Sequence, residues 1–121
     1  MAPRHLRGRV LAGPMLAAAL LLGACSGGSA PEVPEGADGA QDPVLVEGRE
    51  VWSDSCARCH GESGGGGSGV KLSDGRAVEL YPDAADMHAV IADGKNAMPA
   101  FGGSLTPEQI DAVTAYVRDV L

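Results

Sequence analysis

Residues 56–60, Cys-Ala-Arg-Cys-His, constrain this chain more than any other stretch, because very few chemistries use this order of residues. Two thiols separated by two residues lie about one helical turn apart, so both can add to the two vinyl groups along one edge of a porphyrin. The next residue, His60, is then placed to bind the porphyrin iron. The motif therefore predicts one covalently bound haem c, attached at Cys56 and Cys59, with His60 as the proximal ligand.

Two other uses of a C-x-x-C pair stay open as weaker interpretations, beside a merely structural role. A zinc site would need two further ligands, and after residue 60 the chain has no cysteine and a single histidine, His88. A dithiol redox pair is typical of a βαβ pattern, which the sequence around the motif does not show.

The first 24 residues have the composition of a secretory signal: three arginines, then an apolar run over residues 10–22 and a small-residue end. Residues 22–25, Leu-Gly-Ala-Cys, resemble the lipobox of bacterial lipoproteins. That resemblance predicts Cys25 as the lipidated first residue of the mature chain, and the alternative is ordinary cleavage that leaves a free thiol. We expect an exported protein, anchored by lipid to the outer face of the cell membrane or to the periplasmic side of an envelope membrane.

Residues 25–42 are rich in glycine, proline, alanine and acids, which predicts a flexible acidic linker after the lipid-anchor cysteine. The chain carries a net charge of -7, and all three arginines of the signal lie outside the mature part. Such an acidic protein is unsuited to the phosphates of nucleic acid and is suited to basic docking patches on redox partner proteins. Aromatic residues make up only 3% of the chain, so a haem would supply bulk that the core otherwise lacks.

The rest, residues 43–121, is expected to form one helical domain. Asp42 and Pro43 give the start signal of a helix that runs into the haem motif. Gly48 in the middle of this helix predicts a close approach of a second helix. Thr106, Pro107 and Gln109 form a capping box that begins the last helix.

Another helix is predicted over residues 83–92, and residues 61–69 form a glycine-rich loop with no phosphate-binding signature. No alternating strand pattern occurs, so the fold class is all-α.

Three residues compete for the sixth ligand position of the iron. Met98 follows a helix stop and precedes a proline, where irregular backbone can direct a side chain at the metal. Met87 lies on the apolar face of a helix, which favours core packing. His88 lies elsewhere on the same helix and is more typical of a surface or structural histidine. Met98 is therefore the preferred distal ligand.

The ordered set of residues resembles a small class I monohaem cytochrome c of the bacterial electron-carrier type. The matching residues are Gly48, Trp52, Cys56, Cys59, His60, Gly61, residues 94–101, residues 105–110 and Tyr116. The resemblance implies an all-α fold of three or more helices around one haem, with the first and last helices crossing near Gly48 and Tyr116. It further implies thioether bonds at Cys56 and Cys59, and His60 and Met98 as axial ligands.

One position departs from the family pattern. The family usually has Gly-Pro-x-Leu after the glycine loop, with the proline carbonyl accepting the N–H of the proximal histidine. This chain has Gly-Val-Lys-Leu at residues 69–72, so that Val70 must supply the carbonyl.

The predicted function is electron transfer by a monomeric, membrane-tethered cytochrome and not enzymatic catalysis, because two axial ligands leave the iron no open position. Two alternatives remain. In the first, the chain is a haem subunit of a dehydrogenase or reductase complex. In the second, it is a haem enzyme or gas sensor whose distal methionine is displaced.

Overall fold

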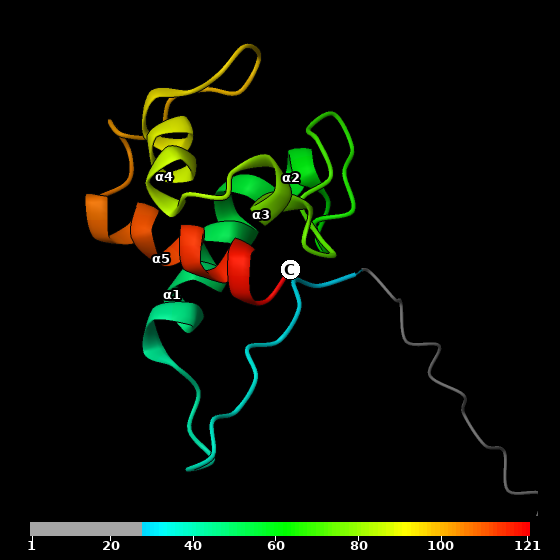
Figure 1. Ribbon diagram of the computed structural model, residues 1–121, viewed down its shortest axis with the longest axis vertical. Helices are drawn as coiled ribbons and strands as arrows, with labels where there is room; N and C mark the ends of the chain where they lie inside the picture. Colours follow the sequence, from blue (N-terminus) through cyan, green and yellow to red (C-terminus); the bar gives the residue numbers. More distant parts are fainter. Residues whose placement is uncertain (1–27) are drawn as a thin grey trace, which may run out of the picture.

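The computed structural model describes residues 28–121, and all of its regular secondary structure is helical (Figure 1). The elements are α1 (Pro43–Val51), the π-helical turn η1 (Trp52–Cys56), α2 (Ala57–His60), α3 (Arg76–Leu80), α4 (Ala84–Asp93) and α5 (Pro107–Asp119). Among these residues the only β pairing consists of two isolated bridges, so the predicted all-α fold is confirmed. None of the described helices has the length and apolar character that would let it cross a membrane.

Helices α1 and α5 form the centre of the domain, as the sequence predicts. The Asp42 carboxylate accepts the Val44 N–H at the start of α1, and Thr106 and Gln109 form the reciprocal capping box of α5. The two helices cross at Gly48, where a Cβ atom would lie 2.7 Å from both the carbonyl carbon of Ala112 and the Cβ of Tyr116. Gly48 therefore permits a backbone contact that no other residue would allow.

The first helix does not run into the haem motif as one regular α-helix. It widens into η1, where the Ala57 N–H donates to the carbonyl of Trp52, five residues earlier. A single π turn of this kind adds one residue to the helical register, and such turns frequently occur at functional sites. The sequence carries no signal for this turn.

Helix α4 matches its prediction closely: Asp83 caps it through the Ala85 N–H, and Gly94, with a φ of 77°, ends it. The sequence does not predict helix α3. It is five residues long and follows Gly75 in the left-handed region without a side-chain cap, so neither periodicity nor capping indicates it.

Residues 28–33, named here the N-terminal strap, pack against α1 and α5. Ala30 and Val33 are 4% and 3% exposed. The Arg49 guanidinium donates to the Ala30 and Pro31 carbonyls at 3.0 Å, and the Tyr116 hydroxyl donates to the Pro31 carbonyl at 2.7 Å. Burial raises the pKa of Tyr116, so this hydroxyl keeps its proton.

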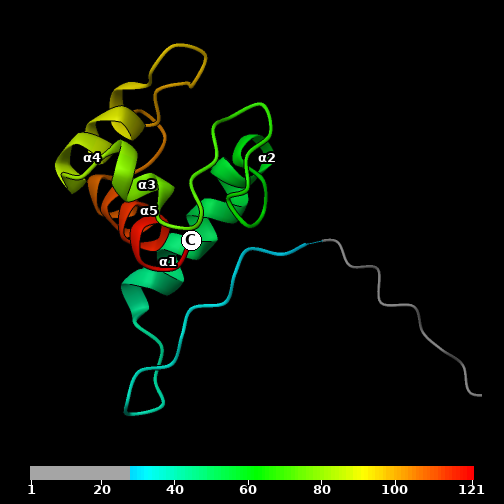
Figure 2. The same ribbon diagram turned by 45° about the vertical axis from the view of Figure 1, so that its right-hand side comes forward.

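The strap differs from the predicted flexible linker over residues 25–42. Its composition of small residues, prolines and acids suggests disorder, whereas its backbone carbonyls are held by two side chains far away in the sequence. Figures 1 and 2 show the strap, in cyan, passing beside the end of α5. The predicted signal segment and Cys25 lie outside the described residues.

Candidate haem site

The two cysteines and the histidine of the motif lie within two consecutive short helical segments. Cys56 ends η1, Cys59 lies in α2, and His60 is the last residue of α2. Gly61 follows with a φ of 82° and turns the chain back on itself. Both cysteines are half-buried free thiols, so both are available for thioether bonds.

The Cys56 thiol has the electrostatics of a sulfur that stays uncharged. Burial, and the nearby thiol of Cys59, raise the pKa of Cys56 to about 11. Zinc ligands and reactive redox cysteines need a stabilised thiolate, whereas a thioether carries no charge and suits a buried position. Among the described residues no group of three or more His, Cys, Asp and Glu side chains could hold a metal ion.

The His60 ring is held by the loop that follows it. Its Nδ1 lies 2.8 Å from the Val70 carbonyl oxygen, which can only accept, so Nδ1 carries the proton. The free lone pair is therefore on Nε2, the arrangement that a metal-binding histidine needs. A Cβ at Gly69 would lie 2.7 Å from two atoms of this ring, so Gly69 packs its backbone directly on the imidazole. The departure to Val70 thus retains the hydrogen bond that the family pattern supplies through proline.

The glycine-rich loop closes on the motif itself. The Gly66 N–H donates to the His60 carbonyl at 2.7 Å, and the Gly69 N–H donates to the Cys59 carbonyl at 2.8 Å. At Gly67 a Cβ would lie 2.8 Å from the Cys59 carbonyl oxygen. Side chains at these positions would separate the loop from the motif, which accounts for the glycine content.

Met98 lies in a tight turn after α4. Lys95 and Met98 exchange two backbone hydrogen bonds of 3.1 and 2.9 Å, and a Cβ at Gly94 would lie 2.8 Å from the Met98 carbonyl oxygen. The Phe101 N–H donates to the Ile91 carbonyl at 3.0 Å, which fastens the far end of the loop to α4. The backbone that carries Met98 is therefore fixed, and its half-buried side chain packs at the edge of the core.

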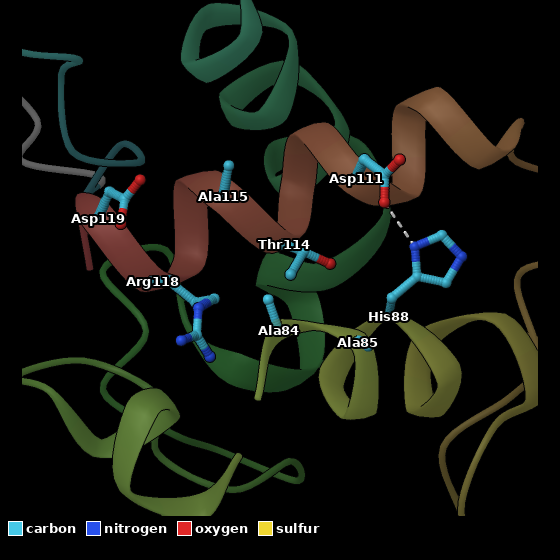
Figure 3. A pocket seen from close by; sticks show the side chains of 8 residues that line it. All are labelled: Ala84, Ala85, His88, Asp111, Thr114, Ala115, Arg118 and Asp119. Carbon is cyan, nitrogen blue, oxygen red and sulfur yellow. Dashed lines mark hydrogen bonds and ion pairs between the residues drawn. The ribbon is translucent and has the colours of Figure 1, made fainter. Parts of the chain in front are cut away.

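The other two candidates for the distal position have different environments. Met87 is 4% exposed and belongs to the hydrophobic core. The Nδ1 of His88 lies 2.7 Å from Asp111, at a hollow of about 500 Å³ between α4 and α5 (Figure 3). Met87 is therefore packed in the core, and His88 is paired with a carboxylate.

In the part of the chain that the structure describes, no hydrogen bond joins residues 56–60 to residues 94–101, but both segments lie toward the same end of the molecule. In Figures 1 and 2 residues 61–69 and residues 94–101 extend on the same side of the α1–α5 pair, the first beside α2 and the second from the end of α4. Exposed apolar side chains occur on this part of the chain: Val70 is 60% exposed, and Val78 and Leu80 are each 38% exposed. The residues present suit a haem through their donor set, because two free thiols stand beside a histidine whose Nε2 can bind a metal.

Two supporting residues were not singled out for their role by the sequence. The indole N–H of Trp52 donates to the Glu62 carbonyl at 2.9 Å, and Arg118 donates to the carbonyls of Tyr81 at 2.6 Å and Pro82 at 3.0 Å. The acceptors are backbone atoms ten and more than thirty residues away, so no sequence pattern indicates the pairing. Arg118 thereby fixes the connection between α3 and α4.

Comparison with known proteins indicates the family of this chain. The sequence model of the family described as cytochrome C oxidase, cbb3-type, subunit III, matches residues 43–117. Cytochrome c6 of Synechococcus elongatus is 44% identical over 78 residues, which cover 62% of this chain and 88% of that protein. The cbb3-type cytochrome c oxidase subunit FixP of Azorhizobium caulinodans is 38% identical over 88 residues, which cover 69% of this chain but only 29% of FixP.

Solved structures give the same result. Cytochrome c6C from Synechococcus superposes with a TM-score of 0.51 at 32% identity, over 59% of this chain and 89% of that one. Cytochrome c6 from the diatom Phaeodactylum tricornutum has a TM-score of 0.51 at 33% identity, over 60% of this chain and 88% of that one. The chain therefore belongs to the cytochrome c family, in the group described as cbb3-type oxidase subunit III, and is a small helical monohaem cytochrome with one covalently attached haem c.

Proposed function

We propose that this protein transfers single electrons, with thioether bonds at Cys56 and Cys59 and with His60 and Met98 as the axial ligands. The observation that carries the proposal is the hydrogen bond from His60 Nδ1 to Val70, which leaves Nε2 free for iron. The haem supplies the Fe(III)/Fe(II) couple.

The chain's own residues then set the conditions for electron transfer without substrate binding. His60 is oriented by Val70 and Gly69, and the turn between Lys95 and Met98 holds the distal residue. With both axial positions filled by protein, no coordination site is left for a substrate, which favours a carrier over an enzyme. As an axial ligand, the thioether sulfur of Met98 also favours the reduced state of the iron and raises its reduction potential.

Spectroscopy of the native protein under redox titration tests this proposal. We expect one reversible single-electron transition, and a ferrous spectrum that carbon monoxide does not change. Ready binding of carbon monoxide by the native ferrous protein would contradict the carrier and would support the haem enzyme or gas sensor with a displaceable methionine.

The proposed chain layout is a lipoprotein signal over residues 1–24, a lipid-bearing Cys25, a connecting segment to residue 42 of which residues 30–33 pack on the domain, and the cytochrome domain over residues 43–121. The strap limits the reach of this anchor. Cys25 lies five positions before Ala30, which is buried, so the distance between the two residues is at most about 18 Å. The domain would then stay close to the membrane that holds its lipid.

Cys25→Ser is expected to release the protein from the membrane fraction, because the variant lacks the thiol that accepts the lipid. Fractionation followed by detection of the haem gives the measurement, and Ser29→Ala, which leaves Cys25 in place, is the control. Retention of the Cys25→Ser protein in the membrane would contradict the anchor.

The excess of acidic residues suits partners with basic docking patches, and such encounters weaken as salt is added. A second candidate is a fixed subunit of an oxidase or reductase complex, which is favoured by the match to cbb3-type subunit III and to FixP. Solubilisation in mild detergent separates the two. Elution as a monomer supports the free carrier, and co-elution with a stoichiometric partner supports the subunit.

A further inference from the structure

Trp52 is buried between α5 and the haem motif. It is 1% exposed, and its ring centroid lies 6.4 Å from that of Tyr116 and 6.0 Å from that of His60. The two ring pairs are tilted by 46° and 38°, within the range of attractive aromatic contacts. Trp52 therefore contacts the core with one neighbour and the candidate proximal ligand with the other.

The indole N–H gives Trp52 a second connection to the same site. It donates to the Glu62 carbonyl at 2.9 Å, and Glu62 is two residues after His60. Between them Gly61 reverses the chain with a φ of 82°, so the hydrogen bond lies across the turn that follows the imidazole. A buried donor of this kind needs an acceptor. Here the acceptor belongs to the turn that directly follows His60.

We propose that Trp52 is a positioning residue for His60, which it aligns through its ring and through the turn at Glu62. The inference rests on the proposed ligation of iron by His60. Val70 and Gly69 hold the imidazole from the loop side, and Trp52 holds it from the core side of the chain. A phenylalanine at residue 52 would retain much of the aromatic packing and would leave the Glu62 carbonyl without this donor.

Trp52→Phe in the full haem-bearing protein tests the role of the N–H. We expect the haem to stay attached while the midpoint potential shifts and the proton NMR shifts of the haem methyl groups, which report the orientation of the axial imidazole, are redistributed. Tyr116→Phe is the matched control, because it also removes one hydrogen bond from a buried ring, the bond to Pro31, but none near His60.

Both substitutions are expected to lower the denaturation midpoint, and only Trp52→Phe is expected to change the methyl pattern and the potential. If Trp52→Phe leaves both as they are in Tyr116→Phe, Trp52 is merely part of the core and the proposal is wrong.

A measurement on the unmodified protein covers the case in which Trp52→Phe does not fold. The indole N–H proton is expected to exchange with solvent only through global unfolding, because it is buried and bonded to Glu62. Fast exchange would also overturn the proposal. Failure of the His60 ligation itself would appear in the haem spectrum of the unmodified protein, and is therefore distinguishable from failure of this inference.

Discussion

Gly48→Ala is expected to lower the free energy of unfolding by about 3 kcal/mol or more, at the upper end of what overpacking costs. The added Cβ would lie 2.7 Å from the Ala112 carbonyl carbon and from the Tyr116 Cβ. Neither atom can rotate away, so α1 and α5 must move apart. The gain of about 1 kcal/mol in helix propensity is too small to offset this. Chemical denaturation of the haem-bearing protein, followed by absorbance, gives the measurement.

Gly103→Ala is the matched control for Gly48→Ala. A Cβ at Gly103 would meet no atom within 4 Å, so its denaturation midpoint is expected to stay near that of the unmodified protein. Equal stability of the Gly48 and Gly103 variants would contradict the close approach of α1 and α5.

Met98→Ala is expected to keep the haem attached and to lower the midpoint potential by on the order of 0.1 V or more, since axial ligands set haem potentials over a range of about 0.8 V. The potential falls because the variant lacks the Met98 thioether, which favours the ferrous state. The ferrous variant is also expected to bind carbon monoxide, whereas the unmodified protein is expected not to bind it. Potentiometric titration and absorbance with and without the gas provide both measurements.

Met87→Leu is the control for Met98→Ala. Met87 is buried in the core, and leucine is a volume-conserving replacement, so the potential is expected to stay unchanged. An unchanged potential in Met98→Ala would remove Met98 from the ligand set. A lowered potential in Met87→Leu would indicate Met87 as the axial ligand instead.

The parts of the fold that the sequence predicts are those written in local signals. The capping box at Thr106 and Gln109 fixes the start of α5 within four consecutive residues, and Gly48 indicates a helix crossing because a glycine there is costly without one. The haem motif is equally local, since five consecutive residues specify the attachment chemistry.

The parts that the sequence does not predict depend on backbone acceptors distant from their donors. Trp52 bonds to Glu62, Tyr116 bonds to Pro31, and Arg118 bonds to Tyr81. Every residue has the same backbone carbonyl, so the residue type does not reveal which carbonyl a given side-chain donor will bind. The sequence does not predict the π turn at η1 either, because this turn depends on a one-residue shift of backbone register and not on a residue type.

The N-terminal strap has a consequence for where the folding unit begins. The family match begins at Pro43, yet Ala30 and Val33 are as buried as residues of the central helices. A chain cut at Pro43 would lose the Ala30 and Pro31 carbonyls that accept from the Arg49 guanidinium and the Tyr116 hydroxyl, together with the buried apolar contacts of Ala30 and Val33. The part of the chain that packs as one body therefore includes residues 30–33 as well as the stretch that the family match covers.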